Sequence, residues 1–181
     1  DCYALVTAFD GYNATLYPMT ADLSPATGHA VTGRVLALAN TSGKVAGSAF
    51  TVIGCDVLIN GEVVATTGAD GVFTIPSLAA GTYTATLSYA YGYDRDIEIT
   101  VADGDVDLGT YGMVVCNFKK DATVDASDYS AYKRATGKSS SDDAYNAACD
   151  FNHDGNIDAT DYRIYKAFTG KNLNNDIYAN A

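Results

Sequence analysis

The stretch that decides the fold of the C-terminal third is residues 150–161, DFNHDGNIDATD. Oxygen-bearing side chains stand at positions 1, 3, 5, 9 and 12 of this stretch, and a glycine stands at position 6. That spacing is the D-x-N-x-D-G-x-I-x-x-x-D pattern of a calcium-binding loop. Calcium takes six to eight oxygen ligands at about 2.3–2.6 Å, and a loop of this kind can wrap them around one ion. The pattern therefore predicts a Ca²⁺ site.

Five side chains and one backbone carbonyl of this loop are the predicted ligands. Gly155 is expected to take the positive φ of the sharp bend, and Ile157 is expected to point away from the ion into the core. The ligating side chains are those of Asp150, Asn152, Asp154, Asp158 (directly or through water) and Asp161, and the carbonyl is that of Asn156.

The same unit occurs twice in the chain. Residues 116–138 read CNFKKDATVDASDYSAYKRATGK, and residues 149–171 read CDFNHDGNIDATDYRIYKAFTGK. At an offset of 33 residues the two segments are identical at twelve of 23 positions, which indicates a duplicated loop–helix unit. Helices are predicted over 128–135 and 161–168, each closed by Thr-Gly. A short helix capped by Ser141 is predicted between the copies, over 142–148.

The first copy has lost part of the ligand pattern. Lys119 stands at position 3, and an ammonium group has no lone pair to offer a cation. Ala122 replaces the glycine and is expected to take the bend at a steric cost. The first loop is therefore expected to bind calcium more weakly than the second, or to stay empty. Its candidate ligands are Asn117, Asp121, Thr123, Asp125 and Asp128.

The residues before the repeat have the pattern of a β protein. Short segments rich in Val, Ile, Thr and Tyr alternate with turn signals, and Asn60-Gly61 predicts a type I′ hairpin turn. Many short strands at this spacing predict an antiparallel β-sandwich of immunoglobulin-like or prealbumin-like type. Strands are predicted over 3–9, 30–39, 50–59, 62–67, 72–75, 82–89, 96–101 and 106–113.

We therefore expect two domains. Residues 1–114 are assigned to the β-sandwich, and residues 115–181 are assigned to an all-α domain with the duplicated calcium loop–helix unit. The four cysteines allow Cys2–Cys55 together with Cys116–Cys149, which keeps each bridge inside one domain. Buried free thiols are the alternative.

The charge of the chain argues against two kinds of partner. The 181 residues carry a formal net charge of −11, which argues against binding nucleic acid, whose phosphates require Lys and Arg. The same charge argues against direct contact with an anionic membrane. An acidic chain fits cation binding.

Two family resemblances rest on these motifs. The run DGVFTIPSLAAGTYT, residues 70–84, resembles the carboxypeptidase-regulatory and Cna-B-like β-sandwich families over about residues 31–111. The order loop–helix, linker, loop–helix over 115–171, with Asp at loop position 12, resembles the dockerin family. A β-sandwich placed directly before such a unit is similar to the X-module–dockerin tandems of cellulosomal scaffoldins and enzymes.

The dockerin resemblance implies a function in assembly. Dockerins bind cohesin modules and so build cellulosomes, the extracellular complexes that degrade plant cell walls, and X-module–dockerin tandems often attach a scaffold to the cell surface. Residues 112–115 leave no room for a flexible tether, so the sandwich is expected to pack on the dockerin and brace it. The implied contacts lie at loop positions 10 and 11 and along each helix. They are Ala126, Ser127, Ser130, Lys133 and Arg134 in the first copy, and Ala159, Thr160, Arg163, Lys166 and Ala167 in the second.

Differences between the two copies favour a single binding orientation. Arg134 is matched by Ala167, and Ser130 by Arg163. Lys133 and Arg134 could meet carboxylates at the rim of an interface, or they could form a solvated helix face.

Three other functions have weaker support in the sequence. Catalysis is not expected, because the only histidines are His29 and His153 and no catalytic set is visible. A carbohydrate-binding sandwich is the alternative function, with tyrosines that could stack on sugars. A calcium sensor would need a Met-rich groove, and the chain has two Met. The sugar-stacking candidates are Tyr83, Tyr89, Tyr91 and Tyr93.

Overall fold

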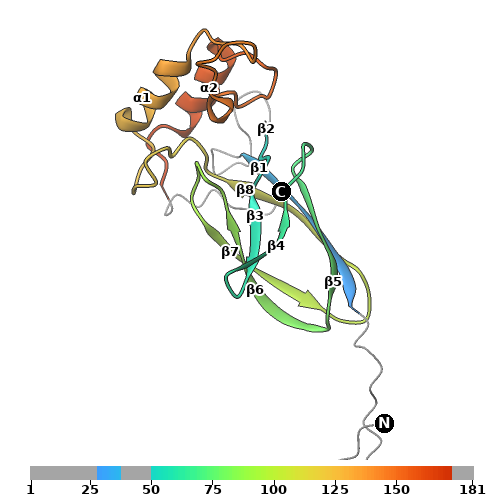
Figure 1. The fold of residues 1–181 in the computed structure, drawn as a ribbon. Helices are drawn as coiled ribbons and strands as arrows, with labels where there is room; N and C mark the ends of the chain where they lie inside the picture. Colours follow the sequence, from blue (N-terminus) through green and yellow to red (C-terminus); the bar gives the residue numbers. More distant parts are fainter. Residues whose placement is uncertain (1–27, 38–49, 173–181) are drawn as a thin grey trace, which may run out of the picture.

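Alternation of buried and exposed residues builds the strands of the N-terminal β-sandwich. The computed structural model describes residues 28–37 and 50–172, and Figure 1 shows the helical module at one end of the sandwich. In β1 every second residue from Val31 to Ala37 is buried, which is the pattern of a strand with one face on a core. The strands are β1 His29–Ala37, β2 Phe50–Thr51, β3 Asp56–Ile59, β4 Glu62–Thr66, β5 Val72–Leu78, β6 Gly81–Ser88, β7 Arg95–Val101 and β8 Val106–Met113.

The strands form two sheets that face each other. One sheet has the order β4-β3-β6-β7, and all of its pairs are antiparallel. In the other sheet β1 pairs with β2, β5 and β8. Side chains of both sheets meet in the core, where the residues that are at most 1% exposed include Val31, Val35, Phe73, Leu87 and Ile99.

One strand pair departs from the predicted antiparallel sandwich. β8 runs parallel to β1, from Val31 opposite Val106 to Ala37 opposite Met113. A hairpin forces its two strands to be antiparallel, but β8 follows β7, which belongs to the other sheet, so no hairpin fixes its direction.

The local turn signals explain the strand boundaries. Asn60 and Gly61 have φ values of 54° and 81°, so the predicted type I′ turn between β3 and β4 is confirmed. The strand predicted over 50–59 is interrupted, and Gly54 takes a φ of 74° in the break. The buried hydroxyl of Thr67 spans the break, since it donates to Val52 O (2.6 Å) and accepts from Cys55 N (2.9 Å). The strand predicted over 3–9 lies outside the described residues.

The C-terminal part of the chain contains two helices and a short 3₁₀ turn. The helices are α1 Ala126–Ala135 and α2 Ala159–Phe168, and the turn is η1 Ala147–Cys149. Both helices begin two residues before the predicted start, because Asp125 and Asp158 act as N-caps and complete capping boxes. Within the described ranges, no helix is long and apolar enough to cross a membrane.

The helix predicted over 142–148 is wrong. Asp142 accepts a hydrogen bond from Ser139 N (2.7 Å), and Asn146 accepts one from Ala148 N (3.1 Å). Side chains that bond to nearby backbone groups compete with helix formation. Only the three residues of η1 follow a helical path here.

The cysteines are free thiols where the structure describes them. Cys55, Cys116 and Cys149 are buried and unbridged, so the predicted Cys116–Cys149 disulfide is wrong and the free-thiol alternative holds. Cys2 lies outside the described residues, and its predicted partner Cys55 is free. Burial raises the pKa of Cys55 to about 12, so its thiolate is rare at neutral pH.

This burial predicts the chemical behaviour of the thiols. In a Cys2→Ser variant at about pH 8, a disulfide reagent should label none of the three buried thiols of the folded protein. All three should react after unfolding in guanidinium. Recovery of a single thiol after unfolding would show that Cys116 and Cys149 are bridged.

Candidate functional site

The two loop–helix units hold each other through matched backbone hydrogen bonds. In each loop the apolar residue at position 8 pairs with the segment that follows the other helix. Val124 and Ile157 are both buried and stand 33 residues apart, as do their partners. The four bonds are Val124 N to Lys171 O (3.0 Å), Gly170 N to Val124 O (2.8 Å), Ile157 N to Lys138 O (2.9 Å) and Gly137 N to Ile157 O (2.8 Å).

Two tyrosines form a second pair of reciprocal hydrogen bonds between the units, at the starts of the helices. Tyr132 of α1 donates its hydroxyl to Asp158 O (2.6 Å), and Tyr165 of α2 donates to Asp125 O (2.6 Å). Their rings stack with centroids 6.2 Å apart. Each helix therefore holds the N-cap residue of the other, and the module has approximate two-fold symmetry.

Asp150 opens the second loop and accepts three hydrogen bonds there. Its Oδ1 accepts from Asp154 N (3.2 Å), and its Oδ2 accepts from Gly155 N (2.8 Å) and from the hydroxyl of Tyr145 (2.6 Å). Gly155 has the predicted positive φ, at 85°. Hydrogen bonding to Asp150 raises the pKa of Tyr145 to about 12.

Asp161 closes the second loop and joins it to α2. Its Oδ1 accepts from Phe151 N (2.8 Å), and its Oδ2 accepts from Asp158 N (2.8 Å). Asp161 is completely buried, and this desolvation raises the pKa of its carboxyl group. Asp158 caps α2 through Thr160 N (2.7 Å), so the same residues form the loop and start the helix.

The middle of the second loop is also organised by short-range bonds. Asn152 Nδ2 donates to Asp154 Oδ2 (2.8 Å), and this bond lowers the pKa of Asp154. Asn156 N donates to Asp154 Oδ1 (2.8 Å). Asp154 thus joins the predicted ligands at positions 3, 5 and 7 of this loop.

The donor chemistry of this loop fits a hard cation. Asp150 is 2% exposed and Asp161 is 0% exposed, and neither takes part in an ion pair with another described residue. Buried carboxylates are costly unless their charge is balanced. No three His, Cys, Asp or Glu side chains of the described ranges are gathered closely enough to hold a metal by themselves. The amide and carbonyl oxygens of Asn152 and Asn156 would have to complete the set.

The first loop keeps the closing carboxylate but differs at its start. Asp128 accepts from Lys119 N and Asp125 N, both at 2.9 Å, as Asp161 does in the second loop. Asn117 replaces the opening Asp, and its amide bonds to both backbone groups of Asp121. Thr123 N donates to Asp121 Oδ1 (3.2 Å).

The bend expected at Ala122 does not occur. Among the described non-glycine residues of the first loop, the positive φ lies at Lys120 (54°). In the second loop, His153 (59°) and Gly155 (85°) both have positive φ. Since an L-residue with a side chain resists the left-handed region, the first loop follows another path at Ala122.

The contact residues implied for the first copy form an exposed face of α1. A groove of about 310 Å³ runs beside this face. The exposed residues are Ala126, Ser127, Ser130, Lys133 and Arg134. The groove is lined by Phe118, Lys119, Ser127, Ser130, Ala131 and Arg134.

The equivalent face of α2 is less open. Thr160 and Ala167 are half-buried, whereas Ser127 and Arg134 at the equivalent positions of α1 are exposed. Three implied contact residues of this copy are exposed, namely Ala159, Arg163 and Lys166.

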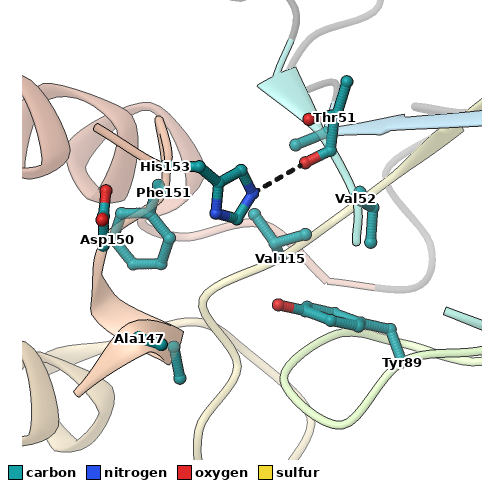
Figure 2. A pocket seen from close by; sticks show the side chains of 10 residues that line it. Thr51, Val52, Tyr89, Val115, Ala147, Asp150, Phe151 and His153 are labelled. Atoms are coloured by element: carbon teal, nitrogen blue, oxygen red, sulfur yellow. Dashed lines mark hydrogen bonds between the residues drawn. The ribbon is translucent and has the colours of Figure 1, made fainter. Parts of the chain in front are cut away.

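The sandwich contacts the helical module through position 4 of both loops. Figure 2 shows the His153 ring directed at Thr51, with a distance of 3.3 Å from Nε2 to the Thr51 carbonyl oxygen. Lys120 is the equivalent residue of the first loop, and its Nζ lies 3.3 Å from Asp94 Oδ1. These junction contacts were missed by sequence reasoning, because position 4 is not a ligand position and its positive φ has no sequence signal here.

Aromatic residues complete the junction. The Tyr91 ring lies 5.7 Å from Tyr89 and 5.3 Å from Phe118, which belongs to the first loop. The Tyr93 hydroxyl donates to Lys171 O (3.4 Å), and Asn117 N donates to Tyr91 O (2.9 Å). Three of the four tyrosines considered as a sugar platform thus pack at the junction.

Comparison with known proteins agrees with this architecture. Residues 118–168 match the dockerin type I domain. Among solved structures, the chain is similar to a C-terminal interface mutant of a type II cohesin–X–dockerin complex from Acetivibrio cellulolyticus, with a TM-score of 0.58. An N-terminal interface mutant of the complex from the same organism has a TM-score of 0.56. In both cases the identity is 26%, and the match covers 80% of this chain and 97% of the other. No curated protein matches.

These findings define the class of the protein. Its C-terminal module is dockerin-like, and its two modules together have the architecture of an X-module–dockerin tandem. The resemblance deduced from the sequence is confirmed.

The junction predicts an effect of one sandwich residue on the helical module. Tyr91→Ala removes the aromatic contact with Phe118, which is worth about 0.5–1.5 kcal/mol beyond burial, so α1 and α2 should be destabilised by roughly that amount. Hydrogen exchange of the helix amides would measure this. Tyr83→Ala is the control, because Tyr83 bonds within the sandwich, to Ala79 O. Equal effects of the two variants on the helices would contradict the coupling.

Proposed function

We propose that this chain is a calcium-dependent docking module that binds a cohesin and thereby assembles or anchors a cellulosome at the cell surface. The observation that carries the proposal is the match of residues 118–168 to the dockerin type I domain, on a fold similar to cohesin–X–dockerin complexes. An extracellular location follows from this role. The fold is that of a docking module, so its work is assembly, and any catalytic activity would belong to a domain attached to it.

Calcium is proposed to bind in the second loop. When bound, it supplies the positive charge that the buried carboxylates of Asp150 and Asp161 lack. Asp154, Asn152 and the Asn156 carbonyl would complete the oxygen set with Asp158. Because Asp158 and Asp161 also form the capping box of α2, fixing these carboxylates fixes the start of the helix.

The cohesin is proposed to contact the face of α1 in a single orientation. All five residues implied for this copy are exposed, and a groove borders them. Lys133 and Arg134 give the face positive charge on a chain whose net charge is −11, which suits an acidic rim on the partner. At the position equivalent to Arg134, α2 carries the half-buried Ala167.

The sandwich is proposed to brace the docking module. This proposal is supported by the contacts of His153 and Lys120 with the sandwich and by the packing of Tyr91 on Phe118. Val115 also forms a β-bridge with Gly92, so the segment that leaves β8 stays attached to the sandwich as it enters the first loop. The carbohydrate-binding alternative has less support than docking, because Tyr93 is 5% exposed and Tyr89 and Tyr91 pack edge to face.

The docking proposal predicts a metal-dependent interaction. Calorimetry against a panel of cohesins should show tight binding to at least one in calcium, and this binding should be lost in excess chelator. Asp154→Ala should raise the calcium concentration needed for binding at least tenfold, because it removes a ligand. Asp143→Ala changes the same charge in the linker and should have no effect. Binding that persists in chelator would contradict the proposal.

The orientation proposal predicts unequal effects of two basic residues. Arg134→Ala should weaken cohesin binding about tenfold or more, as loss of a charged contact near an interface does. Lys166→Ala removes a basic residue from the exposed face of α2 and should change the affinity less than about twofold. Competition binding at fixed calcium would measure both. A larger effect of Lys166→Ala would place the cohesin on α2.

A further inference from the structure

We infer that the side chain of Asn117 holds the first loop closed without a metal, so that the chain binds one calcium ion rather than two. This inference rests on the proposed calcium site of the second loop, because it contrasts the two loops.

Position 1 is where the two loops differ most. In the second loop, Asp150 accepts backbone N–H bonds on both of its carboxylate oxygens, and lone pairs remain for an ion. In the first loop, Asn117 Oδ1 accepts from Asp121 N (3.2 Å), and Asn117 Nδ2 donates to Asp121 O (2.9 Å). Asp150 Oδ2 already accepts from Gly155 N and Tyr145, so the second loop offers the remaining lone pair of a charged oxygen at Oδ1, whereas the first loop offers a neutral amide oxygen beside an N–H donor.

The Asn117 amide has no freedom to turn its oxygen towards an ion. The residue is 0% exposed, and its orientation is defined by its partners, since a carbonyl needs a donor and an N–H needs an acceptor. Rotating the amide by half a turn would break both bonds to Asp121 and leave buried polar groups unpaired. The closed amide pair is therefore the stable state of this loop.

Positions 3 and 6 of the first loop, and its charge, also disfavour a bound calcium ion. Lys119 brings an ammonium to position 3, where the second loop has the amide of Asn152. Ala122 lacks the positive φ that Gly155 has at position 6. The first loop carries three Asp and two Lys, whereas the second carries four Asp and neither Lys nor Arg. The first loop therefore attracts a divalent cation less strongly than the second loop does.

The loop nevertheless keeps the bonds that start its helix. Asp128 accepts from Lys119 N and Asp125 N, and Val124 pairs with Gly170 and Lys171. The first loop therefore fixes the start of α1 without an ion of its own, but α1 also pairs with α2 through Tyr132 and Tyr165, so the docking face still depends on the calcium-bound second loop.

Calcium counting and thermal unfolding of the full chain test this inference. After equilibration with calcium and desalting, elemental analysis should give one ion per chain. Asp150→Ala should reduce this to none, and Asp154→Ala should do the same if Asp150→Ala fails to fold. Asn117→Ala should still bind one ion. Its melting temperature should fall by roughly 3–8 °C, and by the same amount in chelator as in calcium.

Two results would overturn the inference. One is two ions per wild-type chain, or one ion retained by Asp154→Ala. The other is an Asn117→Ala variant that loses an ion and is unchanged in chelator. A wild-type chain with no calcium, but with the chelator-independent effect of Asn117→Ala, would support the closed first loop and refute the calcium site of the second. The triple variant Asn117→Asp, Lys119→Asn, Ala122→Gly should gain a second ion.

Discussion

Two buried carboxylates hold the helical module together. Asp128 and Asp161 are both completely buried, and each accepts backbone N–H bonds from the beginning of its loop and from the N-cap of its helix. A buried carboxylate without such partners would cost several kcal/mol. The loop must therefore wrap around its own closing residue, and the helix must begin where the loop ends. The position of both helices, and of the faces they expose, follows from this constraint.

Much of the fold could be predicted from the sequence wherever a local pattern is compatible with only one local structure. The type I′ turn at Asn60-Gly61 and the bounds of β8 are of this kind. The parallel pairing of β1 with β8 could not be predicted, because it depends on which sheet the last strand joins. The helix expected over 142–148 failed because Asp142 and Asn146 bond to nearby backbone groups instead of continuing a helix.

Part of the candidate site could likewise be predicted from the sequence, and part could not. The duplicated loops were visible as a repeat, and the five residues that the family pattern implied as contacts in the first copy are exposed on α1. The contacts of His153 and Lys120 with the sandwich were not visible, since they depend on a left-handed backbone at residues that are not glycine. The two residues are equivalent in the repeat, yet one meets a carbonyl and the other a carboxylate. The sandwich thus meets a nearly symmetric module with two different surfaces.

The reciprocal tyrosine bonds bear on how the module folds. The hydroxyl bonds of Tyr132 and Tyr165 join residues that are 26 and 40 positions apart, and each connects one copy to the other. Each capping box is complete within its own copy, but the hydroxyl that binds the N-cap carbonyl comes from the other copy, so an isolated loop–helix unit would lose this bond. The entropy of closing these long loops is lost before the contacts that compensate for it can form. The two copies should therefore fold together in one cooperative step, and the duplicated unit, rather than either repeat, is the smallest piece of this chain that can form the docking module.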